Sequence, residues 1–530
     1  MICALSEQPL HLTRVCDVMF RQLSSSWRQK LGIPEPPPEH DASAWKARYR
    51  NVRTRFRAMV DLMDPAPEPK NRRLDHQTFE ARTAERRAQR SEAQWAERYE
   101  RLEWFINRIL EASISLVPRD VLRNWGGSVG VDATLVKSPA RAQKQRRLSK
   151  SRRVRAEILV HSADPGAAWY RREGGHRDDT GEEEGPGRGK LAWGREATLV
   201  VSGSEGPEGT QEFPNLVVGM AVLHPPGHDV GRNGARSLAS VRARGHPANF
   251  LAADRAYSSA KEEDFQLPAT ALGYNPVYDY KIDQLGVKGA HEGFLLIEGA
   301  FYCPSIPPPL IDATRDFREG RIDEATYRLR LEERWNYLAR PKAKPDSEGH
   351  VRLACPAANP WPKVRCDLKP ASVRSENRGR VRIALRSDVK DSPPPPCSQQ
   401  SVTIPPQAGA KFRQSLLFGS AEWQRTYATL RNTNEGFNGY VKDPAHEALD
   451  DAGRRRLNGV AAQSILTALL LLAANVRKIR TFLEEAAVRR AAPDSSGSRP
   501  RRRRTPSLAT WRPRVGADPM TSGPDPPLIA

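Results

Sequence analysis

The chain has 530 residues and carries 84 lysines and arginines against 63 aspartates and glutamates, which gives a formal net charge of +21. This length allows more than one domain, while 44 prolines and 37 glycines indicate long irregular segments between folded parts. The charge favours a polyanionic partner, nucleic acid first, although ribosomal and membrane-surface proteins share this bias. Six cysteines are too few for a disulfide framework, so the composition predicts a reducing cytoplasm.

Residues 1–119 are predicted to form a charged, helical region. Apolar residues recur at three- and four-residue spacing in Ala44–Arg50 and in Glu92–Ala112, the pattern of amphipathic helices. The proline-rich run Asp64–Pro69 between them predicts a rigid linker. Two roles remain open for this region, DNA binding and helical packing or dimerisation, because it contains no clear helix-turn-helix pattern.

A first acidic strand follows at Ser128–Val136, where Asp132 lies within a β-branched, apolar run. The next stretch, Lys137–Arg155, contains nine lysines and arginines and no acid. It is either a solvated basic loop or a segment that lies along a phosphate backbone beside an active site. Residues 171–190 are rich in glycine and mixed charge, which predicts a disordered excursion.

Two more strands are predicted at Arg195–Val201 and Asn215–Leu223, then a helix at Ala235–Arg244. A second acidic strand, Ala248–Ala253, ends at Asp254. This order of strands and helix fits the RNase H-like fold, a mixed α/β sheet with flanking helices. In that fold the first and fourth strands are neighbours, so the assignment predicts that Asp132 and Asp254 meet in space.

The 180 residues between Asp254 and Glu435 are too many for a simple connection. They contain a strand-like run at Gly293–Ile297, a charged helix expected at Ile311–Leu338, and proline-rich segments. We therefore expect a catalytic core at 120–270 and 406–488, interrupted by an insertion domain at 271–405, which the family resemblance described below implies to be β-rich. The core is expected to end in a long helix over Arg455–Glu485, and residues 489–530 in a disordered, arginine- and proline-rich tail.

No membrane span is expected. The longest apolar run, Ile465–Val476, has 12 residues, whereas a spanning helix needs ~20. The run therefore predicts a buried helix, and the first residues of the chain do not have the charged and apolar pattern of a signal peptide.

The segment around Glu435 predicts a helix with chemistry along one side. Tyr427, Arg431, Glu435 and Lys442 stand at offsets of 0, 4, 8 and 15, which places them along one stripe, with Asn438 filling the gap. A carboxylate there could bind a metal ion while the two basic residues hold phosphates. The alternative is a surface helix with an ordinary ion pair. Two glycines in the segment each cost a helix ~1 kcal/mol.

Taken together, these residues resemble the bacterial insertion-sequence transposases with a DDE active site, in the group marked by a Tyr-Arg-Glu-Lys signature. Arg431, Glu435 and Lys442 match the signature spacing, whereas Tyr427 stands one residue farther from Arg431 than the pattern asks. Asp132 in Val-Asp-Ala-Thr and Asp254 in Ala-Asp-Arg-Ala-Tyr are similar to the first and second acids. The resemblance covers roughly residues 120–485.

The resemblance implies a DNA transposase that binds terminal inverted repeats, hydrolyses a strand at the transposon end and transfers it into target DNA. Asp132, Asp254 and Glu435 would ligate two Mg²⁺ (or Mn²⁺) ions, and Arg431 and Lys442, with Tyr427, would contact DNA phosphates. The partners implied are double-stranded DNA and further copies of the chain, in the cytoplasm at the nucleoid. Trp335 and Trp361 are candidates for stacking on a flipped base, with core packing as the alternative for each.

Two other functions stay open. A decayed or domesticated copy would only bind DNA, and an RNase H-like nuclease would cut without joining. A serine or tyrosine recombinase fits less well, because the three carboxylates would then have no role.

The sequence contains further candidate sites besides the acids. Four cysteines in the expected insertion domain could hold a structural zinc ion, although their spacings of 52, 11 and 31 residues include no Cys-x-x-Cys pair. These are Cys303, Cys355, Cys366 and Cys397. His224 and His228 suggest a metal pair or a turn after a strand. Asp279 and Asp283 are rivals to Asp254 that do not share its position at the end of a strand.

Overall fold

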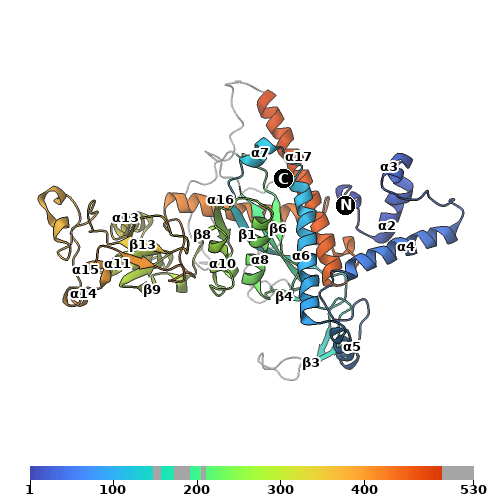
Figure 1. Cartoon of the computed structure of the whole chain (residues 1–530), viewed down its shortest axis with the longest axis horizontal. Coiled ribbons are helices and arrows are strands. Elements are labelled where there is room, and N and C mark those ends of the chain that lie inside the picture. The colour runs from blue at the N-terminus through green and yellow to red at the C-terminus, as the bar shows by residue number, and fades with distance from the viewer. Residues whose placement is uncertain (147–156, 172–190, 204–210, 492–530) are drawn as a thin grey trace. The chain divides into compact units, whose positions relative to one another are not determined.

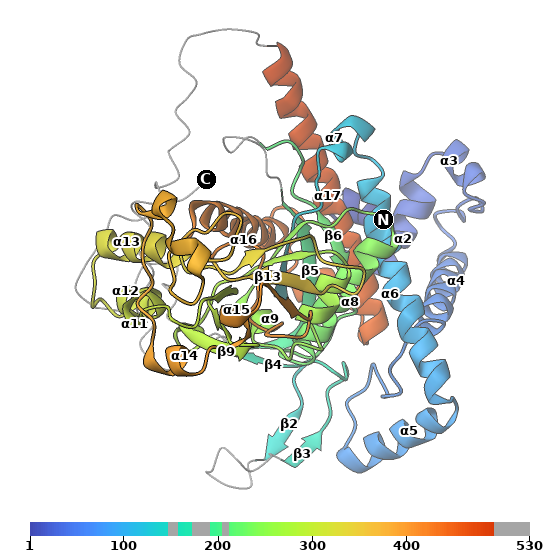
Figure 2. The ribbon, with the colours of Figure 1, turned by 60° about the vertical axis from the view of Figure 1, so that its left-hand side comes forward.

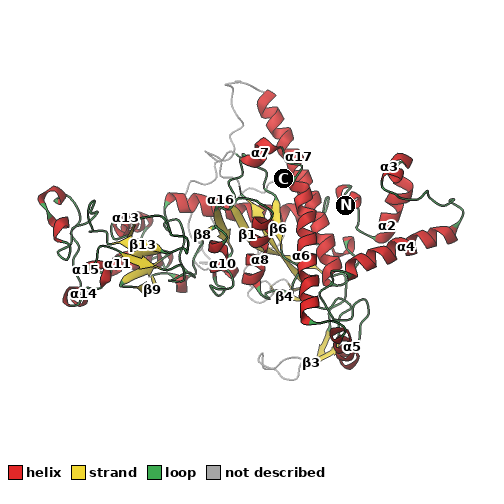
Figure 3. Ribbon diagram, in the orientation of Figure 1, coloured by secondary structure: helices red, strands yellow, loops and turns green. Residues whose placement is uncertain are grey.

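The computed structural model describes residues 1–146, 157–171, 191–203 and 211–491. Of the predicted segments, part of the basic stretch, most of the glycine-rich excursion and the tail from residue 492 lie outside these ranges. The chain divides into two compact units, which we call unit 1 (Met1–Asn275 and Ala428–Ala491) and unit 2, described over Pro276–Tyr427. The fold is mixed α/β with a curled mixed sheet (Figures 1 and 3).

Unit 1 contains most of the helices. The helices of unit 1 are α1 (Ile2–Leu5), α2 (Leu12–Asp17), α3 (Ser25–Lys30), α4 (Ala42–Asp61), α5 (His76–Ala88), α6 (Glu92–Ile114), α7 (Arg119–Arg123), α8 (Val230–Ala243), α9 (Arg255–Ser258), α10 (Gln266–Ala271) and α17 (Val460–Ala491). Helix α16 (Ala421–Lys442) belongs to unit 1 from Ala428 onward. The helices predicted at Ala44–Arg50, Glu92–Ala112, Ala235–Arg244 and around Glu435 are confirmed, each with somewhat different ends.

The predicted strands of unit 1 are confirmed as well. Its strands are β1 (Val129–Lys137), β2 (Lys144–Arg146), β3 (Glu157–Val160), β4 (Ala168–Arg171), β5 (Leu191–Ser202), β6 (Val217–Met220) and β7 (Phe250–Ala253), with β8 (Asn275–Val277) at the boundary with unit 2. The main sheet has the order β4-β5-β1-β7-β8. Its β6 pairs with β5. Strand β2 pairs with β3 in a separate hairpin.

Strand β5 organises the main sheet because it is long enough to pair with three strands. Along one edge it pairs antiparallel with β1, from Val129↔Ser202 to Lys137↔Gly194. Along the other edge, β4 pairs with its beginning and β6 with its end. Strand β1 in turn pairs parallel with β7, so the two acidic strands are neighbours, as expected.

Helices α6 and α17 pack against each other beside β6 (Figure 1). Helix α6 begins in a capping box formed by Ser91 and Gln94, and its Leu102, Ile106 and Leu110 recur every four residues and are fully buried. Along one edge of β6, the backbone hydrogen-bonds to side chains rather than to another strand. Asn107 bonds both N and O of Met220, and Asn475 bonds both N and O of Val217, each at 2.9–3.0 Å.

Helix α17 starts later than the sequence suggests. The predicted start at Arg455 is wrong, because Gly459 adopts φ +96° and the helix begins at Val460. Gly459 N donates to Asp164 Oδ1 at 2.8 Å, and this carboxylate also binds Arg195 at 2.9 Å in a fully buried ion pair. Asp164 therefore joins the start of α17 to β5, because a buried carboxylate must satisfy its oxygens with nearby donors.

Residues Val460–Arg489 of α17 form a helix that is long and apolar enough to cross a membrane, but 83% of its most apolar window is buried within the protein. Its leucines and alanines belong to the main core of unit 1, together with residues of α6, α16, β5 and β6. The predicted buried helix over Ile465–Val476 is therefore confirmed.

Unit 2 combines two small antiparallel sheets with short helices. The sheets are β11-β10-β9 and β12-β13-β14, formed by β9 (Val287–His291), β10 (Phe294–Ile297), β11 (Ala300–Tyr302), β12 (Arg340–Pro341), β13 (Val351–Ala354) and β14 (Val402–Ile404). Its helices are α11 (Pro308–Ile311), α12 (Ala313–Arg318), α13 (Glu324–Trp335), α14 (Ser387–Asp391) and α15 (Pro395–Ser398). The single helix expected over Ile311–Leu338 is wrong: Gly320, at φ +73°, lies between α12 and α13.

Candidate functional site

The three predicted acids come from three elements of unit 1: β1, the end of β7, and α16. The parallel pairing of β1 with β7 sets Val131 opposite Ala253, and Asp254 N donates to Val131 O at 3.4 Å. Asp132 and Asp254 are the residues that follow this pair in their strands. The register of two parallel strands therefore brings the first two acids side by side, although 121 residues separate them in the sequence.

Helix α16 approaches β1 closely because residue 130 is glycine. A Cβ at Gly130 would lie 2.3 Å from Asn434 Nδ2 and 2.8 Å from Leu430 O. In the orientation that satisfies both partners, the Asn434 amide donates to Gly130 O at 3.2 Å and accepts from Val131 N at 3.0 Å. Since side chains alternate along a strand, Gly130 and Asp132 face the same side of the sheet. This contact therefore sets Glu435, the next residue of the helix, near the two aspartates.

Asp132 is held by two donors. Ala133 N donates to its Oδ1 at 2.8 Å, and Asn438 Nδ2 donates to its Oδ2 at 2.9 Å. The Asn438 Oδ1 atom is buried and has no hydrogen-bond partner within the described part of the chain. A carboxylate next to an unpartnered amide oxygen offers the hard oxygen atoms that Mg²⁺ and Mn²⁺ prefer.

The electrostatics of Asp132 reflect its crowded position. Burial raises the pKa of this carboxyl to about 6, and the negative charges of Asp254 and Glu435 act in the same direction. The hydrogen bond from Ala133 and the positive charge of Arg431 act against this rise. Asp254 and Glu435 are exposed, but their negative charges lie close to the largely desolvated Asp132, so this site favours a bound metal ion when Asp132 is ionised.

The raised pKa predicts that Asp132→Asn stabilises the metal-free protein. In the unfolded chain an aspartate has a pKa of ~3.9, whereas in the folded chain Asp132 has a pKa of about 6. The folded state therefore binds the proton more tightly, and the stability of the wild type falls as the pH rises through this interval. Asparagine does not ionise, so the variant should be more stable at pH 7.5 by roughly 1–3 kcal/mol.

Denaturant unfolding without divalent ions, at pH 7.5 and near pH 4, measures this difference. The gain should be much smaller near pH 4, where Asp132 is protonated in the folded state and about half protonated in the unfolded chain. Asp120→Asn, at an exposed position, should show no gain at either pH. Equal stability of Asp132→Asn and wild type at pH 7.5 would contradict the proposed charge crowding.

The other three residues of the predicted stripe also lie on α16. Arg431 forms an ion pair with Glu435 at 3.0 Å, and both side chains are about half exposed. Lys442 is the last residue of α16. Tyr427 lies in unit 2, where its ring stacks on Trp423 with centroids 5.3 Å apart. The contact of a tyrosine with DNA phosphates thus stays a prediction, and stacking on Trp423 gives Tyr427 a structural role.

Tyr257 and Asn434, which the sequence did not single out, complete the site together with Asn438 of the predicted stripe. Tyr257 is fully buried, its hydroxyl lies 3.3 Å from Thr198 Oγ1, and burial raises its pKa well above the ordinary value. Asp132 and Asp254 are close enough to add to that rise, so Tyr257 lies beside the acids as a neutral group. The signal for Tyr257 was its position three residues after Asp254. The signal for Asn434 and Asn438 was their position on either side of Glu435.

The acids are spaced more widely than the ligands of a single closed metal site. Among the described residues, three ligand atoms of His, Cys, Asp or Glu lie within 4.8 Å of one another only in the group His76, Glu80 and His161. Wider spacing suits acids that hold two ions, since paired ions lie ~3.5–4 Å apart and each acid need not reach both.

No family model, curated protein or solved structure matches this chain.

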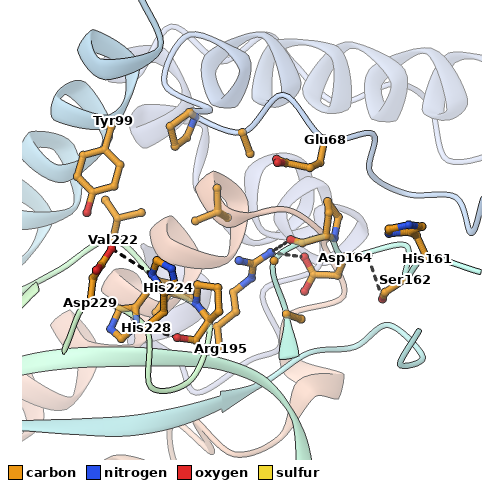
Figure 4. A pocket seen from close by; sticks show the side chains of 18 of the residues that line it. Glu68, Tyr99, His161, Ser162, Asp164, Arg195, Val222, His224, His228 and Asp229 are labelled. Carbon is orange, nitrogen blue, oxygen red and sulfur yellow. Dashed lines mark hydrogen bonds and ion pairs between the residues drawn. The ribbon is translucent and has the colours of Figure 1, made fainter. Parts of the chain in front are cut away.

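A cavity lies in another part of unit 1. It has a volume of about 440 Å³ and is lined by residues that include Tyr99, His161, Asp164, Arg195 and His224 (Figure 4). None of the three acids lines it. His224 is buried, and its Nε2 lies 3.1 Å from Thr198 Oγ1. Burial lowers the pKa of His224 to about 4, so it is a neutral hydrogen-bonding group. His228 pairs with Asp229 at 3.1 Å. These contacts explain the two histidines without a shared metal ion.

The remaining candidates lie in unit 2. Asp279 forms an ion pair with Arg318 at 2.6 Å, which gives it a structural partner of its own. Trp361 is 74% exposed, so the alternative of core packing is wrong for this residue, whereas Trp335 packs against a small core cluster. All four predicted zinc ligands are free, buried cysteines, and Cys303, Cys355 and Cys366 share one core cluster.

Proposed function

We propose that this chain is a bacterial insertion-sequence transposase of the DDE type. Its catalytic core would be RNase H-like, formed by the main sheet and the helices of unit 1, with unit 2 as the inserted domain. The observation that carries the proposal is the meeting of Asp132, Asp254 and Glu435, from two adjacent parallel strands and a helix packed on one of them. The net charge of +21 suits a DNA substrate.

The residues at this site fit a pair of Mg²⁺ or Mn²⁺ ions. Asp132, Asp254 and Glu435 would hold them, and the unpartnered Asn438 Oδ1 is a further oxygen ligand within reach of Asp132. Bound there, the ions supply Lewis acidity, which activates the attacking hydroxyl and offsets charge on the leaving oxygen. A metal pair would also offset the burial and the nearby negative charges that raise the pKa of Asp132.

The chain's own residues would position the DNA. The ion pair between Arg431 and Glu435 is exposed, and exposed pairs contribute only ~0–1 kcal/mol, so it can be exchanged at little cost. Glu435 would then turn to the metal ions, and Arg431 to a phosphate near the cut. Lys442, farther along the helix, would hold a second phosphate, and these charges would stabilise the transition state of phosphodiester exchange.

The proposed partners follow from this chemistry. The substrate would be double-stranded DNA that carries the element's terminal repeats, and a second DNA would be the target. Joining two ends requires at least two active sites, so the chain would act as a homo-oligomer on DNA. We propose the cytoplasm, at the nucleoid, as the place of action.

The test of the function uses Mg²⁺ and a DNA fragment with the ends of the flanking element, followed by a second assay with added target DNA. Cleavage and joining together would support the transposase. Cleavage without joining would favour the nuclease. Binding without cleavage would favour a decayed copy that acts only as a DNA-binding protein.

We further propose that the four cysteines of unit 2 hold a structural Zn²⁺, which would draw together sulfur atoms of which, among the described residues, no three lie within 4.8 Å of one another. Burial raises the pKa of Cys303, Cys355 and Cys366, but in each case a backbone hydrogen bond from two residues downstream acts against that rise. The donors are Ser305, Ala357 and Leu368. Hydrogen bonds to sulfur favour the thiolate form, which is the form that binds zinc.

Purified full-length protein is accordingly expected to contain one zinc ion in thiolate coordination. Cys366→Ser should lose this ion and destabilise the protein, because the binding free energy of a structural metal contributes to folding. Cys16→Ser, at a buried cysteine of unit 1, is the matched control and should keep it. Zinc content near zero in the wild type, measured by elemental analysis, would end the proposal.

A further inference from the structure

A second group of metal-ligating side chains lies in unit 1, apart from the acids. His76 and Glu80 are on α5, and His161 directly follows β3, which lies beside α5 (Figure 2). His76 Nδ1 is 2.9 Å from His161 Nε2 and 3.9 Å from Glu80 Oε1. All three ligand atoms lie within 4.8 Å of one another.

Local structure holds each of the three residues in place. Asp75 caps α5 by accepting a hydrogen bond from Thr78 N at 2.9 Å, so His76 is the first residue of the helix. Glu80 follows four residues later and therefore shares its face. His161 N donates to Leu74 O at 2.8 Å, which ties the end of β3 to the residues before α5.

The His161 ring is also fixed by packing. Phe79 is buried and stacks on it with ring centroids 3.6 Å apart and planes 4° apart. The packing therefore holds the His161 ring with its Nε2 toward His76, so little side-chain freedom is left for a bound ion to restrict. Residues that are already held in position lose little conformational freedom when a ligand binds.

The donor set indicates the class of ion. Two imidazole nitrogens with one carboxylate suit Zn²⁺ and similar transition metals, whereas Mg²⁺ prefers oxygen ligands only. Zinc bonds of ~2.0–2.1 Å in a tetrahedral site place ligand atoms about 3.3 Å apart. The observed separations of 2.9 and 3.9 Å lie on either side of that value. Both separations would have to shift by about half an ångström, and the separation of His161 from Glu80, which is within 4.8 Å, would have to reach the same value.

The surroundings leave room for a fourth ligand. The side chains of His76 and Glu80 are 56% and 59% exposed, so one side of the group faces solvent. Three protein ligands with an open fourth position are typical of zinc sites that keep a water molecule.

We propose that His76, Glu80 and His161 bind one Zn²⁺ ion, with water as the fourth ligand. The ion would join α5 to the end of β3 and so stiffen the attachment of the β2–β3 hairpin. This inference goes beyond the proposed function and does not depend on it.

The test uses the full-length protein, freed of metal, and titrates it with Zn²⁺ and Co²⁺ in the presence of excess Mg²⁺. We expect one ion per chain bound by nitrogen and oxygen, beyond any ion held by the cysteines. Bound Co²⁺ separates the two sites, because cysteine ligation adds intense sulfur-to-metal charge-transfer bands and a His-Glu-His site has only weaker visible bands.

His76→Gln and Glu80→Gln should each weaken binding at this site by about 100-fold or more, since loss of a direct ligand exceeds the ~10–100-fold effect of losing an outer-shell partner. Both positions are exposed, so the variants should fold. His40→Gln, at an exposed histidine elsewhere in unit 1, is the matched control and should bind as the wild type does.

Unchanged affinity and stoichiometry in His76→Gln and Glu80→Gln would overturn the proposal, and the two imidazoles would then be joined by a hydrogen bond alone. The same conclusion would follow if the wild type bound no Co²⁺ without sulfur ligation. Glu435→Gln should leave this site unchanged, so failure of zinc binding and failure of the DNA-cleaving site are distinguished by the same set of proteins.

Discussion

Glu435→Gln is expected to lower the rate of Mg²⁺-dependent DNA cleavage by at least about 10³-fold, which corresponds to ~4 kcal/mol of transition-state stabilisation. Glutamine keeps the size of the side chain and its place on α16, but it removes the negative charge that a hard cation requires. Because Asp132 and Asp254 would remain, the variant isolates the contribution of the third acid. The measurement is single-turnover cleavage of DNA that carries the ends of the flanking element.

The same variant should keep its fold and its affinity for DNA. Glu435 is exposed, and among the described residues its ion pair is the surface pair with Arg431, so the stability should change by no more than ~0.5 kcal/mol. Removal of a negative charge close to the DNA should not weaken binding. Glu422→Gln, at an exposed position on the same helix, is the control and should cut normally. Full cleavage by Glu435→Gln would show that this residue is not a metal ligand.

Gly130→Val is expected to separate α16 from β1 and to reduce cleavage by about 100-fold or more, since a displacement of ~1 Å at a reacting site has an effect of this size. A side chain at this position would collide with Asn434 and with the backbone of Leu430, which cannot move away without moving the helix. The helix carries both Glu435 and Asn438, so both would leave Asp132. Overpacking of this kind should also destabilise unit 1 by roughly 1–3 kcal/mol.

The matched control for this variant is Gly436→Ala on α16. A Cβ at Gly436 would have nothing within 4 Å, and alanine is favoured over glycine in a helix by ~1 kcal/mol, so this substitution should stabilise the protein. Thermal unfolding and cleavage assays of both variants provide the comparison. Normal cleavage by Gly130→Val would mean that close packing of α16 on β1 is not needed to place the third acid.

The two variants test different parts of the site. Loss of activity in Glu435→Gln with an unchanged fold reports on chemistry, whereas loss of activity in Gly130→Val reports on the position of a helix. Mg²⁺-dependent stabilisation of the protein supplies a readout besides cleavage, because an ion that binds the folded state raises its stability. Both variants should lose this stabilisation, and both controls should keep it.

Much of the secondary structure could be predicted from local patterns. Apolar, β-branched runs identified β1, β5, β6, β7 and β10, and helical periodicity identified α4, α6, α8, α16 and α17. Errors occurred where backbone geometry at one residue decides the outcome. Gly320 interrupts the helix expected over Ile311–Leu338, and Gly459 delays the start of α17. In each case a left-handed φ, which glycine adopts without strain, overrides the periodic pattern.

The candidate site was accessible to sequence analysis only in part. A carboxylate in a buried strand is unusual enough to be noticed, so Asp132 and Asp254 could be selected from their neighbours in the chain. The supporting residues carry no such signal. Asn107 and Asn475, which bond the edge of β6, are indistinguishable in the sequence from any other polar residue within a helix.

Local side-chain patterns specify which segments form strands and helices and which of them carry acids, because these depend on side chains within a few positions of one another. Only the tertiary structure decided that β1 lies next to β7, that α16 contacts β1 at Gly130, and that His76, Glu80 and His161 form one group. The physical reason is that contacts between distant segments depend on strand register and on the close approach of backbones. Those quantities are set by the packing of the whole unit rather than by any local pattern.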